Sequence, residues 1–276
     1  MAGFRVVAPL IAAALTTPAC LLVSLGGLTG GAGPTDATTD DSEGGTLQGY
    51  AAVVSADSPL AYWRFDEHAG ATTAHDASGH GNDATYQGGV TLGAPGALGG
   101  DPDTAASFDG VTGFVDAGNR FQFAGQTPFS VEAWVLPGPE TSYVGVMSRN
   151  DAVGGPPSEG YLLFLAPDGG PFGFQRLEGE QVSTAVTTAS PSTSAFTHLV
   201  ATFDGVEMSV YADGELQGAQ TASFSIAGAV ADFVVGAEAG GSSNYFAGTL
   251  DEVAVYDHAL TSDRVRAHYL AGLGSP

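Results

Sequence analysis

The strongest constraint on the fold is a succession of short segments in which apolar and polar residues alternate. Three of them are FSVEAWV at 129–135, FTHLVATF at 196–203 and EMSVYA at 207–212. In the first, the odd-numbered residues are apolar and share one face of a strand, while Ser130, Glu132 and Trp134 share the other. This alternation predicts a sheet with one face in a core and one face that carries polar and aromatic groups.

Turn-forming residues separate these segments. Gly alone accounts for 41 residues, and Asp213-Gly214 suits the type I′ turn of a hairpin. About ten to fourteen strands in one domain predict an all-β, two-sheet antiparallel sandwich or jelly roll. Helical patterns are confined to YAAVVSAD from Tyr50 and to a short C-terminal helix, TSDRVRAHYLAG. Thr261 or Ser262 is the expected N-cap of that helix, and Gly272 its end.

The first 32 residues have the layout of a targeting segment. One early Arg precedes a nearly uncharged apolar run from Val6 to Leu28, which predicts a secretory signal peptide. The run is also long enough for an uncleaved anchor, and Cys20 leaves lipidation as a third interpretation. We expect a secreted or cell-surface protein. Cys20 is the single cysteine, so the folded domain is expected to contain no disulfide.

Composition divides the remainder into two parts. Residues 33–49 are rich in Thr, Asp and Gly without periodicity and are predicted to be a disordered linker. Residues 50–272 are predicted to form one folded domain. The formal net charge is −23, with no Lys. Such a domain would repel nucleic acid and anionic membranes, because affinity for both depends on neutralising phosphates.

The ordered motifs identify a family resemblance. DSPLAYWRFDE, DASGHGNDATYQGGVTLGAPGAL, TAASFDGVTGFVDAG, FTHLVATFDG and YFAGTLDEVAVYDHALTSDRV follow one another over residues 50–272. This order resembles the bacterial laminin-G-like domains of the concanavalin A-like lectin/glucanase superfamily. The resemblance implies a concanavalin A-like jelly roll whose two sheets face each other. It also implies an exported module that binds a glycan or a surface protein, often with a structural calcium ion.

The stretch HDASGHGNDA at 75–84 is the candidate calcium loop. Calcium prefers six to eight oxygen ligands, and Asp76 and Asn82 offer oxygens beside two glycines. The resemblance further implies an ion that joins an early loop to an Asp of the last strand. We therefore expect Ca²⁺ to be bound by Asp76, Asn82 and Asp251. The alternative for this stretch is a tight surface turn in which Asp76 forms an Asx turn.

Two histidines, His75 and His80, flank the same loop. Zinc needs three or four converging ligands, so both are interpreted as surface residues. Trp63 and Trp134 lie in predicted strands and are interpreted as packing residues. A glycan would need exposed rings beside polar groups. The candidates for this role, in the middle and late parts of the chain, are Tyr143, Arg149, Tyr161, Phe172, Phe174, Arg176 and Tyr245.

Catalytic patterns are absent from the sequence. Glycosidases of this fold class carry E-x-D-x-x-E on one strand face, which supplies two converging carboxylates. Here Glu132 and Glu207 are isolated, and the adjacent Asp251 and Glu252 are expected on opposite faces of their strand. The prediction is a non-catalytic recognition module. Two alternatives remain open: a structural or adhesive surface protein without a sugar ligand, and a glycoside hydrolase or lyase with a non-standard site.

Overall fold

The computed structural model describes residues 49–140, 142–151 and 158–274. Contacts within the chain separate Met1–Gly45 from a compact unit, Thr46–Pro276, to which all described residues belong. The predicted signal peptide and nearly all of the predicted linker lie outside the described residues. Neither helix in the described part of the chain has the length and apolarity needed to cross a membrane.

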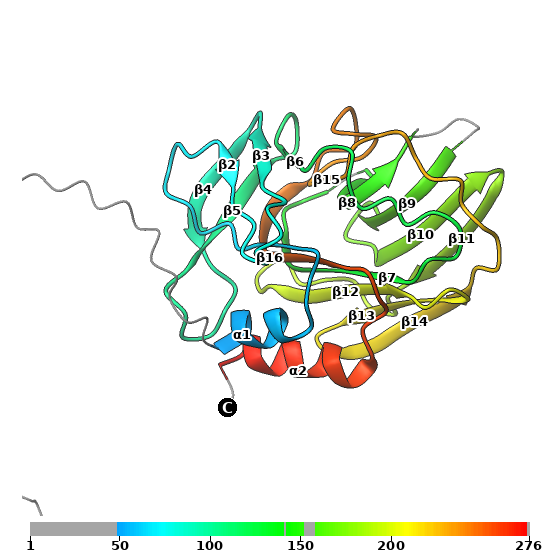
Figure 1. The fold of residues 1–276 in the computed structure, drawn as a ribbon. Helices are drawn as coiled ribbons and strands as arrows, with labels where there is room; N and C mark the ends of the chain where they lie inside the picture. Colours follow the sequence, from blue (N-terminus) through cyan, green and yellow to red (C-terminus); the bar gives the residue numbers. More distant parts are fainter. Residues whose placement is uncertain (1–48, 141, 152–157, 275–276) are drawn as a thin grey trace, which may run out of the picture. The chain divides into compact units, whose positions relative to one another are not determined.

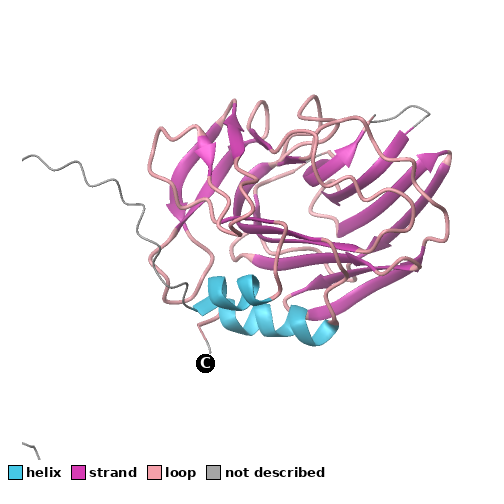
Figure 2. Cartoon of the chain, in the orientation of Figure 1, coloured by secondary structure: helices cyan, strands magenta, loops and turns pink. Residues whose placement is uncertain are grey.

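Two antiparallel sheets dominate the structure (Figures 1 and 2). The first, sheet A, has the strand order β14-β13-β12-β7-β16-β5-β4, and β1 also pairs with β16. The second, sheet B, has the order β11-β10-β9-β8-β15-β6-β3-β2. This architecture confirms the prediction of an all-β sandwich of the jelly-roll type.

The strands of sheet A are β1 (Ala61–Trp63), β4 (Val90–Pro95), β5 (Thr104–Asp109), β7 (Phe129–Pro137), β12 (Thr197–Phe203), β13 (Glu207–Ala212), β14 (Glu215–Thr221) and β16 (Ala247–Tyr256). Those of sheet B are β2 (Thr73–Ala74), β3 (Ala84–Gln87), β6 (Phe114–Asp116), β8 (Val144–Asn150), β9 (Ser158–Leu165), β10 (Phe172–Gly179), β11 (Gln181–Val186) and β15 (Val234–Val235). As predicted, Asp213 (φ 53°) and Gly214 (φ 77°) form the turn between β13 and β14 with the two positive φ angles of a type I′ turn.

The main core lies between the sheets. On β7, the apolar residues Phe129 and Val131 face this core and alternate with residues that do not, as the sequence predicts. Aromatic rings fill much of the space: the Phe129 ring lies 4.5 Å from that of Tyr161 and 5.8 Å from that of Phe174. Trp63 is fully buried here, in agreement with its interpretation as a packing residue.

The outer face of sheet A is covered by the two helices, α1 (Gly49–Ala56) and α2 (Ser262–Gly272) (Figure 2). The polar and aromatic face of β7 is therefore buried, and Trp134 packs there against Tyr50. Thr261 is the N-cap of α2, as predicted. Gly272 is the last residue of α2, as predicted. It also packs closely on the sheet, because a Cβ there would stand 2.2 Å from the Trp134 ring.

Candidate functional site

A pocket of about 420 Å³ opens on the outer face of sheet B. Its floor consists of Leu162 and Phe164 of β9 and Leu177 of β10, which alternate along their strands with residues of the main core. A volume of this size lies in the range of small-molecule sites, about 300–1,000 Å³. The described residues that line it are Ser142, Tyr143, Asn150, Ser158, Leu162, Phe164, Gln175, Leu177, Glu238 and Asn244.

Two glycines make room for the aromatic floor of this pocket. Phe164 pairs with Gly145 on β8 and with Gly173 on β10, so it has a glycine on each side. A Cβ at Gly173 would lie 2.2 Å from Cζ of Phe164, and a Cβ at Gly145 would lie 2.7 Å from Cγ of Glu238. The missing side chains therefore allow the Phe164 ring to lie across β10 and the Glu238 side chain to lie across β8.

Tyr143 supplies the accessible ring of the pocket. Its side chain precedes β8 and is 54% exposed, and its ring centroid lies 5.5 Å from that of Phe164 at a tilt of 56°. The buried Phe164 ring thus supports an exposed ring from behind. An exposed ring held in this way offers the apolar face against which a sugar ring can pack.

The polar lining surrounds one carboxyl group, that of Glu238. This side chain is 4% exposed, and its burial raises the pKa of the carboxyl, while hydrogen bonds with Asn244 and Asn150 act in the opposite direction. Gln175 of β10 adds a third amide to the lining. Amides and a carboxyl together offer both donors and acceptors, which is what sugar hydroxyls require.

The structure separates the sequence-predicted ligand residues. Tyr143 lines the pocket, but Tyr161 is buried in the main core, as are Phe172 and Phe174. Arg149 and Arg176 are also buried: Arg149 donates to the carbonyls of residues 120 and 229, and Arg176 stacks 3.7 Å above the Phe203 ring. The expectation that these side chains contact a ligand is therefore corrected, because each is enclosed by protein.

The last of these candidates, Tyr245, is half-buried outside the pocket. Its hydroxyl donates to the carbonyl oxygen of Gly241, and its ring packs beside Phe114. Sequence reasoning missed Phe164, Glu238 and Asn244. The one signal for Phe164 is its place in GYLLFLAP, where it falls on the opposite face from Tyr161 and Leu163.

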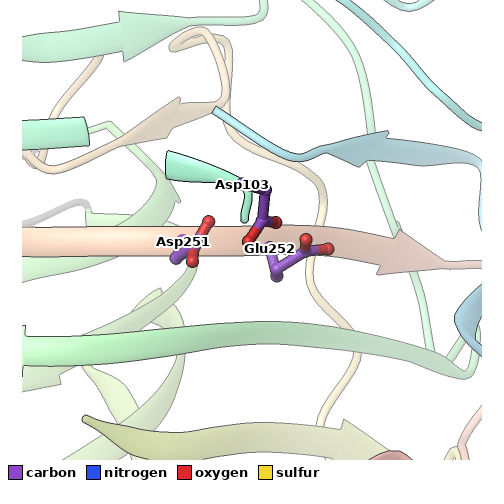
Figure 3. Close-up of side chains that lie close together, drawn as sticks. All are labelled: Asp103, Asp251 and Glu252. Carbon is purple, nitrogen blue, oxygen red and sulfur yellow. The ribbon is translucent and has the colours of Figure 1, made fainter. Parts of the chain in front are cut away.

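A second feature is a cluster of three carboxylates, Asp103, Asp251 and Glu252, on sheet A (Figure 3). One oxygen from each lies within 4.8 Å of the others. Adjacent strand residues normally face opposite sides, but a β-bulge inserts one extra residue in β16 between Asp251 and Ala254. Glu252 lies in this bulge at φ 52°. The bulge overturns the expectation that Asp251 and Glu252 face opposite sides.

The carboxylates of this cluster are only partly neutralised. Arg64 donates to Oε1 of Glu252 at 3.0 Å and to Oδ2 of Asp103 at 2.7 Å, and the Tyr62 hydroxyl donates to Oε2 of Glu252. Oδ1 of Asp103 and Oδ1 of Asp251 are buried without a hydrogen-bond partner. Burial, and then the neighbouring carboxylate of Asp103, raise the pKa of Asp251 to about 8.

This donor set fits a hard divalent cation. Buried carboxylate oxygens without donors are costly unless a cation is near, and oxygen ligands suit calcium. The loop around Gly96 folds closely over the cluster: the Ala97 amide donates to Oδ2 of Asp251 at 2.8 Å, and a Cβ at Gly96 would lie 3.0 Å from Oδ1 of Asp103. Asp103 and Asp251 would hold the ion, with Glu252 positioned by Arg64.

Asp76 and Asn82 are the other two predicted calcium ligands, and Asp76 is not one of the three clustered carboxylates. The carboxylate of Asp76 accepts from the backbone N–H groups of Tyr62, Ser78 and Asn82 at 2.8–3.0 Å. The Asn82 amide donates to the carbonyl of Leu60. These contacts are those of a turn that ties the loop to β1, and they match the Asx-turn alternative for this stretch.

The comparisons with known proteins agree with this architecture. A family model of laminin-G type, described as the concanavalin A-like lectin/glucanases superfamily, matches residues 108–266, more than half of the chain. The chain therefore belongs to this superfamily, as the motifs indicated. No curated protein matches the chain by sequence.

Several solved structures share the fold. Domain 4 of AbnA, a GH43 extracellular arabinanase from Geobacillus stearothermophilus in complex with arabinotriose, is 21% identical (TM-score 0.59), over 76% of this chain and 98% of that domain. The binding domain of Paraclostridial Mosquitocidal Protein 1 is 12% identical (TM-score 0.58), over 78% of this chain and 52% of that one.

A third similar structure is Trypanosoma rangeli sialidase in complex with sialic acid. It is 16% identical (TM-score 0.55), over 76% of this chain and 32% of the sialidase. This chain thus spans about half of the mosquitocidal binding domain and about a third of the sialidase. At these identities the three likenesses establish the fold.

Proposed function

We propose that this protein is a non-catalytic recognition module that binds a glycan in the pocket on sheet B. The observation that carries the proposal is the exposed Tyr143 ring, supported by Phe164 and placed beside Glu238, Asn150, Asn244 and Gln175. Stacking of a ring on the apolar face of a sugar, with polar groups at its edge, is the chemistry that glycan recognition needs. The solved arabinotriose complex of domain 4 of AbnA supports the same ligand class.

The distribution of carboxylates supports the non-catalytic part of this proposal. Glycoside hydrolysis uses two carboxyl groups, about 5–5.5 Å or about 6.5–9.5 Å apart, on either side of the scissile bond. Glu238 is the single carboxyl among the described residues that line the pocket. The three-carboxylate cluster is a poor alternative, because Asp251 and Glu252 are fully buried on the outer face of sheet A.

We further propose that the Asp103–Asp251 cluster holds a structural calcium ion. The ion would satisfy the two partnerless Oδ1 atoms and join the loop around Gly96 to the last strand. Its ligand on the early part of the chain is then Asp103 and not Asp76. The N-terminal pattern supports export to the outside of the cell, where calcium concentrations in the millimolar range match extracellular modules with Kd values near 10⁻⁴ M.

A glycan array with the full chain tests the proposal. We expect binding to a coherent class of sugars. Tyr143→Ala should weaken it about 2- to 13-fold, since an aromatic contact contributes about 0.5–1.5 kcal/mol. Tyr143→Phe is the matched control: it keeps the ring, and binding should stay within about twofold if the ring stacks on the sugar. Folded protein that binds no sugar would favour the alternative, a structural or adhesive surface protein.

A further inference from the structure

The pocket on sheet B contains no cationic side chain among its described lining residues. Its polar groups are hydroxyls (Ser142, Ser158), amides (Asn150, Gln175, Asn244) and the carboxyl of Glu238. This composition leaves nothing to compensate the charge of an acidic sugar. A carboxylate or sulfate group that enters such a pocket loses its hydration and gains no ion pair in return.

The basic residues of the described chain are committed elsewhere. The sequence has no Lys. Arg64, Arg264 and Arg266 form ion pairs with carboxylates away from the pocket. Arg120, Arg149 and Arg176 donate to backbone carbonyls. None of these six arginines lines the pocket, and the net charge of −23 adds an unfavourable field for any anion that approaches.

We propose that this pocket selects uncharged glycans, and that Glu238 is the specificity-determining residue that rejects sugars with a carboxylate or sulfate group. The inference rests on the proposed glycan binding. The buried Glu238 side chain is fixed between β8 and the amides of Asn150 and Asn244, so it can accept from sugar hydroxyls but cannot withdraw from an anion. Two negative charges about 6 Å apart, at an effective dielectric constant of about 20, weaken binding about 100-fold.

The test compares matched pairs of immobilised glycans bound by the full chain at pH 7. Suitable pairs are oligogalactosides against oligogalacturonates of the same length, and N-acetyllactosamine against its sialylated and sulfated forms. We expect each neutral sugar to bind at least about tenfold more tightly than its acidic partner. This difference in affinity should become smaller in high salt, because screening weakens charge repulsion. An acidic partner that binds as tightly as the neutral one, or tighter, overturns the proposal.

The variant Glu238→Gln assigns this selectivity to one residue. It keeps the shape of the side chain and removes its charge, so the ratio of acidic to neutral affinity should rise about 10- to 100-fold. Glu180→Gln, at the exposed turn between β10 and β11, makes the same change in net charge outside the pocket and should leave the ratio unchanged. An unchanged ratio in Glu238→Gln contradicts the role of Glu238. Failure of the chain to bind any member of either set contradicts glycan binding itself.

Discussion

Nε2 of His198 lies 2.6 Å from Oε1 of Glu132, at diagonal positions of the paired strands β12 and β7 on the outer face of sheet A. Both side chains are fully buried beneath the helices. The same carboxylate accepts from the hydroxyls of Tyr50 and Tyr256, each at 2.7 Å, and contacts Nδ1 of His268 at 3.0 Å. Glu132 therefore joins both helices to the sheet, and it is a structural residue.

Removing the charge of Glu132 is expected to destabilise the fold. Glu132→Gln leaves His268 and His198 buried without their carboxylate, and loss of one partner of a buried ion pair costs about 3–5 kcal/mol. Urea unfolding followed by tryptophan fluorescence measures the change, because Trp134 lies in the same layer. Glu207→Gln, at an exposed position of β13, should cost less than about 0.5 kcal/mol. Equal midpoints for the two variants would contradict this role of Glu132.

The same network predicts a dependence of stability on pH. Burial alone would lower the pKa of His268, but Glu132 and Asp57 raise it above 6.5. Burial alone would raise the pKa of Glu132, but His268 and His198 hold it well below 4.5. The His268 contribution is complete below pH 6.5 and is lost as the pH rises through the folded pKa. The Glu132 contribution is complete above pH 4.5 and is lost as the pH falls through the folded pKa.

We therefore expect the network to stabilise the fold most between about pH 4.5 and 6.5. His268→Gln should remove the loss of stability on the alkaline side of this window. Thermal unfolding of both proteins in millimolar calcium measures the difference, since the proposed calcium ion would keep the carboxylates on β16 ionised in both. Parallel pH profiles above pH 6.5 would show that His268 does not carry the effect.

Calcium is expected to stabilise the protein through Asp251. With a Kd near 10⁻⁴ M and millimolar calcium, binding contributes about 1.4 kcal/mol to the free energy of unfolding. Asp251→Asn should abolish this gain. Asp76→Asn should retain it, because Asp76 contacts backbone N–H groups and lies outside the carboxylate cluster. Differential scanning calorimetry with calcium and with EDTA checks both variants, and the reverse pattern would restore the metal assignment to Asp76.

Without calcium, Asp251 should make stability fall with increasing pH. Its folded pKa of about 8 exceeds its ordinary value of 3.8, so between these values the folded state binds a proton that the unfolded state does not. Stability in EDTA should therefore decrease from about pH 4 to pH 8 and be recovered by calcium. Burial also raises the pKa of Glu252 well above its ordinary value, so Asp251→Asn should make this slope shallower without removing it. A slope unchanged in the variant would assign it to groups other than Asp251.

Gly272 is expected to tolerate no side chain. In Gly272→Ala the new Cβ would meet the Trp134 ring at 2.2 Å, so α2 must shift away from sheet A. Overpacking of this kind costs about 1–3 kcal/mol, although Ala favours helix elsewhere. Leu270→Ala, at an exposed position of α2, should change stability by less than about 0.5 kcal/mol. A Gly272→Ala variant more stable than the native chain would contradict the packing argument.

The sequence alone determined which face of β7 enters the core, because alternation along a strand is a local property. It also indicated the sandwich and the hairpin at Asp213-Gly214, and it limited the N-cap of α2 to Thr261 or Ser262, since each depends on neighbouring residues. The family resemblance placed Asp251 on the last strand, beside a candidate ion site. It could not show that the polar face of β7 is covered by two helices far apart in the sequence, α1 and α2.

The tertiary structure decided the sites. The pocket depends on strand register, because strand pairing places Phe164 between Gly145 and Gly173. Glu238 reaches the same pocket from a loop that is distant in the sequence. Asp251 and Glu252 converge with Asp103 because a bulge breaks the alternation that sequence reasoning assumes. Alternation follows from the backbone of a single strand, whereas pairing register and bulges depend on the strands beside it, and those neighbours are fixed only when the whole chain is folded.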